Sequence, residues 1–214
     1  MKKSITALAS LFITSSVFAS EVTVTINTQD NEPLPGAVVY LTPTQPSAIE
    51  APTATAIMDQ VARKFEPHIL AVQKDTPVSF PNSDSIKHHV YSFSPAKVFE
   101  LQLYRGSETD PVIFGKTGTV ELGCNVHDWM LGYIYVVDTP YFKQSDESNV
   151  VTVDVPNGEY ELKVWHPRLK DKDASQTRTV NITAPAQFTV SMQQSLLPAA
   201  QDLDDEIDEF SDYE

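Results

Sequence analysis

Positive charge is scarce in this sequence: 15 lysine and arginine residues stand against 29 aspartate and glutamate residues, giving a formal net charge of −14. A chain this acidic repels the phosphates of nucleic acid, which excludes DNA or RNA binding as its main function. Long hydrophobic runs are missing as well. The apolar stretch near the start, residues 5–12, is too short to span a bilayer, and no later segment is longer and as apolar.

The first residues instead have the pattern of an export signal. Lys2 and Lys3 form a positive start, the apolar stretch follows, and a run of small residues leads to Ala19. This order fits cleavage by a signal peptidase after Ala19. We expect residues 1–19 to be a cleaved signal peptide, and the mature protein to reach the periplasm without a membrane span.

The acidic excess is concentrated at the end of the chain. Residues 201–214 contain eight acidic side chains, which repel one another and resist burial. We expect residues 195–214 to form a disordered, solubilising acidic tail. Docking on a basic partner remains an alternative because four apolar residues are interleaved with the acids: Leu203, Ile207, Phe210 and Tyr213.

Cysteine is almost absent, since Cys124 is the only one in the chain. A disulfide framework within one chain is therefore excluded. In an exported protein a lone cysteine forms an intermolecular bond, serves as a reactive thiol or binds a metal. Cys124 is consequently the most informative single residue in the sequence.

Helical periodicity is also lacking beyond the export signal. Short runs in which Val, Ile and Thr alternate with polar residues recur along the chain, separated by Pro-Gly and Asn-Gly turns. This pattern predicts an all-β fold of sandwiches or barrels. A two-strand piece at residues 21–41 would be marginally stable alone. We therefore expect residues 21–48 and 141–194 to form one flanking β-sandwich around an inserted domain at 57–140, with two independent flanking modules as the alternative.

Potential metal ligands are concentrated in two segments. Cys124, His127 and Met130 lie at positions i, i+3 and i+6 of one loop between predicted strands, and His88 and His89 begin a strand about 36 residues earlier. A thiolate, two imidazoles and a weak thioether suit copper cycling between Cu(I) and Cu(II). Each residue alone has a structural explanation, because a buried free cysteine is usually part of a core. Their joint occurrence favours a metal site for electron transfer.

Both segments resemble the cupredoxins, the blue copper proteins of the plastocyanin and amicyanin kind. The Cys-x2-His-x2-Met spacing is most similar to the short ligand loop of amicyanin. The upstream part of the resemblance consists of Phe80, Asn82, Asp84, His88 and Val90. The similarity covers about residues 58–139. The whole chain is similar to exported proteins labelled methylamine utilization proteins, in which a cupredoxin is set in a carboxypeptidase-regulatory-like (Ig-like) β-sandwich.

The resemblance implies one type 1 copper ion bound by four residues: His88, Cys124, His127 and, axially, Met130. It further implies single-electron transfer to a redox partner protein, without enzymatic activity, through the exposed imidazole edge of His127. Trp129 and Leu131 would supply an apolar rim for brief docking.

One position departs from the family pattern, since His89 replaces the asparagine that usually follows the upstream ligand. Strand alternation places His88 and His89 on opposite faces, so only one can point at Cys124. Alignment with the His-x-Val pattern favours His88 as the ligand, because the buried face fixes the register of a strand.

Copper binding or trafficking without electron transfer is the main alternative function. It is less favoured because such proteins often offer several exchangeable Met or His ligands, whereas the chain after residue 19 has three methionines, of which one lies in the motif. Zinc is a weaker alternative, since a thioether is a poor zinc ligand. Five histidines cannot supply the second cluster of a multicopper oxidase. His68 and His166 fall outside the motif, and we expect His166 to be structural in the flanking sandwich, with a second metal site as the alternative.

Overall fold

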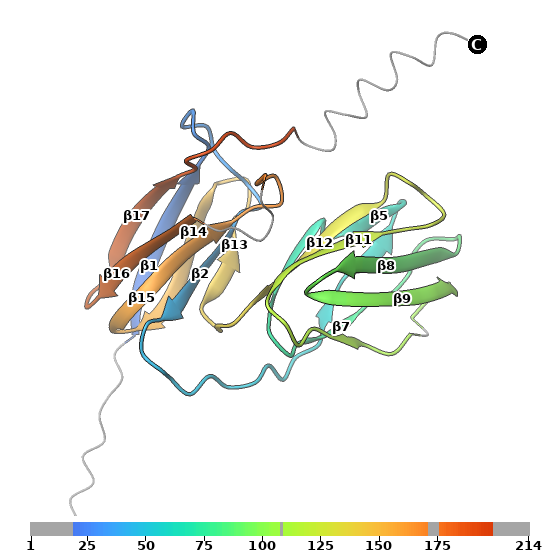
Figure 1. Ribbon diagram of the computed structural model, residues 1–214, viewed down its shortest axis with the longest axis horizontal. Helices are drawn as coiled ribbons and strands as arrows, with labels where there is room; N and C mark the ends of the chain where they lie inside the picture. The colour runs from blue at the N-terminus through green and yellow to red at the C-terminus, as the bar shows by residue number, and fades with distance from the viewer. Residues whose placement is uncertain (1–18, 108, 171–175, 199–214) are drawn as a thin grey trace, which may run out of the picture.

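The computed structural model describes residues 19–107, 109–170 and 176–198. Within these ranges the chain forms seventeen strands and no helix, so the predicted all-β class is confirmed. Two lobes lie beside each other (Figure 1). The expected signal peptide and acidic tail lie almost entirely outside the described residues. No helix that could cross a membrane occurs in the described part of the chain.

The flanking lobe is built from strands at both ends of the described sequence. One sheet has the order β14-β1-β17, comprising β1 (Ala19–Asn27), β14 (Val150–Pro156) and β17 (Ala186–Ser191). The other has the order β13-β2-β15-β16, comprising β2 (Val38–Pro43), β13 (Phe142–Gln144), β15 (Gly158–Trp165) and β16 (Gln176–Ile182). Strand β1 pairs antiparallel with β14 and parallel with β17, so it lies at the centre of its sheet.

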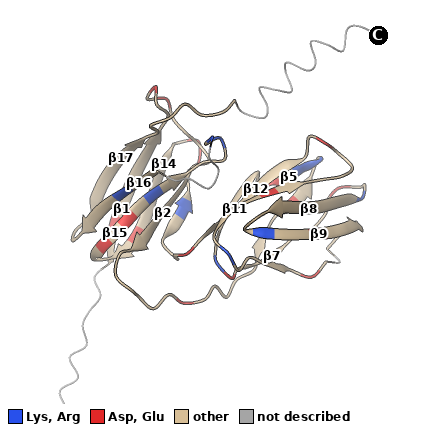
Figure 2. Ribbon diagram, in the orientation of Figure 1, with Lys and Arg blue, Asp and Glu red and all other residues tan. Residues whose placement is uncertain are grey.

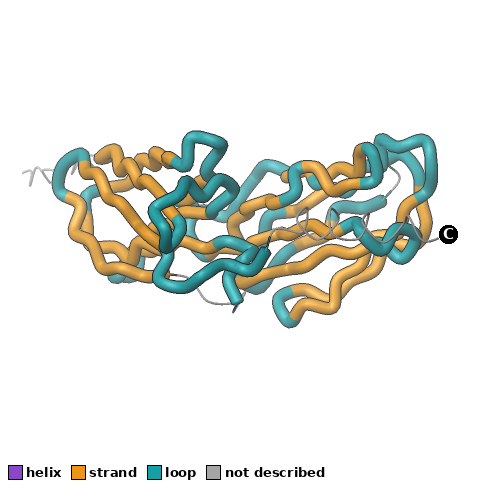
Figure 3. Tube along the Cα trace, turned by 90° about the horizontal axis from the view of Figure 1, so that it is seen from above, coloured by secondary structure: helices purple, strands orange, loops and turns teal. Residues whose placement is uncertain are grey.

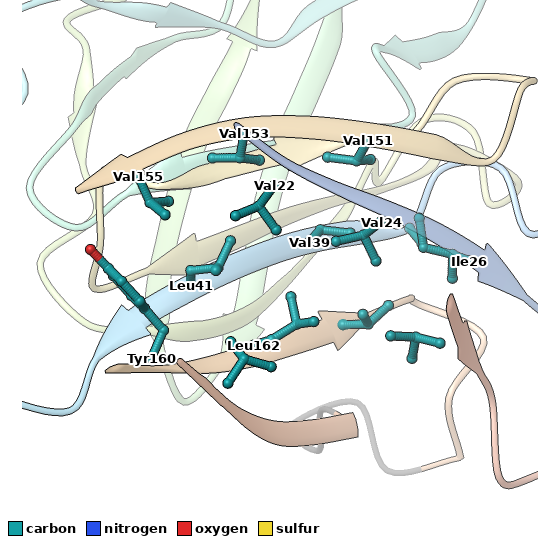
Figure 4. Packing of buried hydrophobic residues seen from close by; sticks show 14 of the residues in the cluster. Val22, Val24, Ile26, Val39, Leu41, Val151, Val153, Val155, Tyr160 and Leu162 are labelled. Atoms are coloured by element: carbon teal, nitrogen blue, oxygen red, sulfur yellow. The ribbon is translucent and has the colours of Figure 1, made fainter. Parts of the chain in front are cut away.

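An apolar core fills the space between these two sheets (Figure 4). Alternation along β1 buries Val22, Val24 and Ile26 completely, while the residues between them point outward or lie at the rim. Leu41 and Leu162 face them from the second sheet. Full burial of such a side chain stabilises the fold by roughly 1.5–3 kcal/mol. Period-two sequence alternation is therefore what holds this lobe together.

The inserted lobe comprises strands between residues 56 and 137. Its largest sheet has the order β6-β12-β11-β8-β9, comprising β6 (Ile69–Gln73), β8 (His88–Ser94), β9 (Lys97–Tyr104), β11 (Gly118–Gly123) and β12 (Leu131–Val137). A second sheet has the order β10-β7-β3, comprising β3 (Ala56–Ile57), β7 (Pro77–Ser79) and β10 (Val112–Ile113). Strands β4 (Asp59–Val61) and β5 (Lys64–Glu66) form a hairpin.

A separate apolar cluster forms the core of the inserted lobe. Phe80 packs against Phe99 and Phe114, with ring centroids 5.5 and 6.5 Å apart. Cys124 and Met130 belong to the same cluster, at exposed fractions of 3% and 2%. The loop that carries the predicted ligands is therefore anchored in the core of this lobe.

The two lobes meet through aromatic side chains. Trp165 from β15 is fully buried and stacks on Tyr135 from β12, with ring centroids 4.1 Å apart and planes 11° from parallel. The hydroxyls of Tyr40 and Tyr135 are hydrogen-bonded at 2.9 Å. Figure 3 shows the strands of the two lobes following one another along the long axis of the molecule. The flanking lobe thus covers the outer face of β12, and the loops at the ends of β8 and β11 belong to the inserted lobe alone.

Candidate metal centre

Three strand ends meet at one edge of the five-stranded sheet. His88 is the first residue of β8, Cys124 directly follows β11, and Met130 directly precedes β12. Strands β11 and β12 are antiparallel neighbours, and β8 joins β11 where Tyr91 pairs with Gly123. Sheet pairing therefore brings His88 next to a loop that lies 36 residues away in the sequence.

The donor atoms of three predicted ligands lie close together. Cys124 Sγ is 3.8 Å from His88 Nδ1 and 4.0 Å from His127 Nδ1, and all three donor atoms lie within 4.8 Å of one another. Metal–sulfur and metal–nitrogen bonds of about 2.3 and 2.0 Å, meeting at a trigonal angle, place the donors about 3.7 Å apart. The cluster is therefore sized for one metal ion.

The fourth predicted ligand, Met130, lies at the end of the same loop. Its backbone N–H donates to the carbonyl of His127 at 3.0 Å, which closes the loop into a tight turn. Its side chain is buried in the apolar cluster that also contains Cys124. The loop thus presents a thiol and an imidazole together, and its last residue, Met130, is buried in the core of the inserted lobe.

His88 is held from behind by a carboxylate. The ring of His88 is completely buried, and its Nε2 lies 2.7 Å from Asp84 Oδ2. Burial raises the pKa of Asp84, but hydrogen bonds from Arg63, His88 and Ala62 outweigh that effect and lower it below its usual range. An ionised carboxylate at this distance can accept a hydrogen from Nε2, while the other ring nitrogen, Nδ1, lies 3.8 Å from Cys124 Sγ. Sequence reasoning included Asp84 in a pattern but gave it no function.

Asn82 organises the loop that precedes His88. Its side-chain amide donates to the carbonyls of Ile86 and Tyr104 at 3.0 and 2.9 Å, and its side-chain oxygen accepts the N–H of Asp84 at 3.0 Å. The loop is thereby tied to the end of β9. This explains why an asparagine two residues before Asp84 suits the position.

His89 faces away from the cluster. Its Nε2 lies 2.7 Å from Glu100 Oε1 on β9, and its Nδ1 is buried without a hydrogen-bond partner among the described residues. The strand pairing shifts at this point, since His88 pairs with Tyr104 and Val90 with Leu101. Such irregularities re-aim side chains next to functional sites. The structure therefore brings His88, and not His89, to Cys124.

An exposed apolar rim surrounds His127, whose ring is partly exposed. The ring of Trp129 lies 5.2 Å from that of His127, and 59% of Trp129 is exposed. Three more exposed apolar residues belong to the inserted lobe: Val61, the last residue of β4, and Ile86 and Val126, which lie in loops. Leu131, predicted as part of this rim, packs instead with the aromatic residues between the lobes. Desolvation, followed by the charges of His88 and Arg63, lowers the pKa of His127.

The remaining histidines of the described chain lie apart from this cluster. His166 is 5% exposed and accepts the N–H of Arg168 on Nδ1 at 3.2 Å. Among the His, Cys, Asp and Glu side chains of the described residues, one group is placed to hold a metal, and it consists of His88, Cys124 and His127.

The charges of the described residues are spread over the molecule, and Figure 2 shows both signs on both lobes. The eight acids of residues 201–214 lie outside the described ranges.

Known structures similar to the chain include a purple cupredoxin from Nitrosopumilus maritimus, with 22% identity, 38% of this chain and 99% of that chain covered, and a TM-score of 0.34. A copper-containing nitrite reductase from Thermus scotoductus SA-01 has 21% identity, 45% of this chain and 25% of that chain covered, and a TM-score of 0.38. A reduced mutant of amicyanin has 19% identity and a TM-score of 0.37. The match covers 46% of this chain and 99% of the amicyanin chain.

No family model matches the sequence, and no curated protein matches it. The chain covers a quarter of the length of the nitrite reductase chain and nearly all of the two smaller cupredoxins. At these identities and TM-scores, the evidence for a metal centre comes from the positions of His88, Cys124 and His127 in this chain.

Proposed function

We propose that the protein is a type 1 copper protein that carries single electrons between redox partners, with His88, Cys124, His127 and an axial Met130 as ligands. The observation that supports this most directly is the cluster of one thiol and two imidazole nitrogens at 3.8 and 4.0 Å. A soft thiolate with two imidazoles and a nearby thioether is the donor set of blue copper sites. Copper, when bound, supplies the one-electron redox step.

The protein's own residues give the ligands different exposures. His88 and Cys124 are 0% and 3% exposed, which keeps water from those donors. His127 reaches the surface, where Trp129 and Val126 provide exposed apolar contact area. We infer that electrons enter and leave through the edge of the His127 ring while a partner protein docks briefly on this rim. The proposed function is electron transfer without substrate turnover.

The site lies in the inserted lobe of a two-lobed chain. We propose that residues 57–140 are a cupredoxin domain inserted in a carboxypeptidase-regulatory-like sandwich formed by residues 21–48 and 141–194. The separate apolar clusters of the two lobes support this division. The export pattern of residues 1–19 supports a periplasmic location.

An absorption and electron paramagnetic resonance spectrum after addition of Cu(II) tests the function. We expect an intense thiolate-to-copper band that disappears completely in Cys124→Ala and persists in His89→Ala, because His89 faces Glu100. Copper that binds without this band, or is reduced without being reoxidised, would indicate copper trafficking. A colourless site that prefers zinc, or loss of the band in His89→Ala, would contradict the proposed ligand set.

A further inference from the structure

The neighbouring residues His88 and His89 of β8 each pair with a carboxylate. Only the first pair, His88 with Asp84, contacts the candidate metal centre. The side chain of Asp84 is 15% exposed and that of its partner His88 is fully buried, whereas Glu100, the partner of His89, is 54% exposed. A hydrogen bond shielded from water holds its geometry more firmly than one at the surface. The environment of Asp84 therefore differs from that of an ordinary surface acid.

Both carboxylate oxygens of Asp84 are engaged. Oδ1 accepts the N–H of Ala62 at 2.7 Å, while Oδ2 accepts the N–H of Arg63 at 2.9 Å and faces His88 Nε2 at 2.7 Å. Three contacts from two segments fix the plane of the carboxylate. Because a rotation of Asp84 would break bonds to both segments, the His88 ring is oriented together with the turn at residues 61–64.

The turn itself needs this support. Ala62 and Arg63 adopt φ values of 51° and 60°, in the left-handed region that side chains other than glycine rarely occupy. Such residues persist when surrounding contacts determine their conformation. The two N–H groups bound by Asp84 are those of the two strained residues. The turn also carries Val61, which is 42% exposed, and Arg63, whose charge acts on His127.

We propose that Asp84 is a positioning residue of the metal centre. It fixes His88 in the tautomer with the hydrogen on Nε2, so that the Nδ1 lone pair faces Cys124, and it joins this ligand to the turn at residues 61–64, whose Arg63 acts on the partly exposed His127. The metal-related part of this inference rests on the proposed function, whereas the tautomer is a property of the metal-free chain. A carboxylate behind a ligating imidazole raises the basicity of that ligand, and its negative charge favours Cu(II) over Cu(I).

The first test uses the metal-free full-length chain. Nitrogen-15 NMR of the imidazole rings should show His88 with hydrogen on Nε2 alone, and Asp84→Ala should give a mixture of tautomers. The amide hydrogens of Ala62 and Arg63 should exchange faster in the same variant. Asp59→Ala is the matched control, since Asp59 on β4 accepts the Oγ hydrogen of Ser83, the residue before Asp84, at 2.7 Å and has no hydrogen bond to a predicted ligand among the described residues. An unchanged His88 tautomer in Asp84→Ala would overturn the proposal.

The second test measures copper binding in both oxidation states. Asp84→Asn keeps the size of the side chain and removes its charge. We expect its Cu(II) affinity to fall about 10- to 100-fold and its Cu(I) affinity to fall less, while Asp59→Asn changes neither. Equal losses for Cu(I) and Cu(II), or equal effects of the two variants, would contradict the inference. If the wild-type chain binds no copper, the proposed function fails, and the NMR result still decides whether Asp84 positions His88.

Discussion

The flanking and inserted lobes are both packed β-structures with apolar cores, yet they distribute their buried polar residues differently. The core of the flanking lobe consists of aliphatic and aromatic side chains such as Val24, Leu41 and Leu162. Both lobes bury some polar side chains, such as His166 in the flanking lobe, but the inserted lobe gathers Asn82, His88 and His89 at one end of its largest sheet. Buried polar groups are costly unless they are paired. The inserted lobe therefore buries hydrogen-bonded polar side chains, in place of apolar ones, at the end where the predicted metal ligands meet.

The difference shows how stability and chemistry are divided within the molecule. The flanking lobe adds its aromatic contact with β12 and contributes no donor atom to the cluster at His88, Cys124 and His127. The ligand loops lie at strand ends, where side-chain and backbone hydrogen bonds hold them in place of a sheet partner. We expect substitutions at the lobe interface to affect folding, and substitutions at the strand ends to affect metal binding.

Trp165→Ala is expected to cause the largest loss of stability, because Trp165 lies between the two lobes. Removing this fully buried side chain leaves a cavity between the lobes and should lower the free energy of unfolding by about 3–5 kcal/mol. Urea denaturation of the metal-free protein measures this change. Trp129→Ala is the control, because 59% of Trp129 is exposed and its loss should alter stability by less than about 0.5 kcal/mol. Loss of the copper band in folded Trp165→Ala would show that the lobes are not separable.

The pH dependence of the free energy of unfolding tests the burial of His166, a residue of the flanking lobe. Burial, followed by the charge of Arg168, lowers the pKa of His166 to about 4. The unfolded chain takes up this proton near pH 6.5, so the folded state loses stability as the pH falls from 6.5 to 4, by roughly 3 kcal/mol at most. His68, whose pKa burial also lowers, adds a loss in the same direction. Unfolding of His166→Gln across this range should depend less on pH, and an unchanged pH dependence would contradict the assignment.

The sequence predicted the strands and the ligand segments because both are local signals. Alternation along residues 22–26 identifies a strand, and the spacing from Cys124 to Met130 identifies a loop. Pairing between distant segments has no such local signal. The parallel pairing of β1 with β17, and the stacking of Trp165 on Tyr135, depend on contacts between residues far apart in the chain.

Asp84 illustrates the same limit within the metal centre. Its position four residues before His88 is visible in the sequence, but its bonds to Ala62 and Arg63 depend on where the β4–β5 hairpin lies. A carboxylate near a histidine in sequence is common and does not indicate contact. The opposite orientations of His88 and His89 were expected from strand alternation, which is a local rule, but the irregular pairing of β8 with β9 at this point could not be read from the sequence.

Gly123→Ala should disturb the strand end next to Cys124. A Cβ atom at this position would lie 2.6 Å from Cζ of Tyr91, so the ring or the backbone must move. We expect destabilisation of about 1–3 kcal/mol, measured by urea denaturation, together with a shifted copper spectrum. Gly115→Ala is the control, since its Cβ would lie 3.4 Å from the nearest atom, Asp75 Oδ1. Combining Gly123→Ala with Tyr91→Ala should recover the spectrum, and an unaltered effect in the double variant would exclude this clash as the cause.

The smallest structural change that still distinguishes chemistry from packing is Met130→Leu. The two side chains have similar volumes, so the free energy of unfolding should change by less than about 1.5 kcal/mol. If Met130 is the axial ligand, loss of its weak donor should keep the coloured site and raise the reduction potential, because the thioether no longer stabilises the oxidised ion. Met58→Leu is the matched control, since Met58 is fully buried in the same apolar cluster and lies outside the ligand loop. Spectroelectrochemical titration of both variants decides the matter, and equal potentials in the two would place Met130 with the core residues and leave the copper ion with three ligands from this chain.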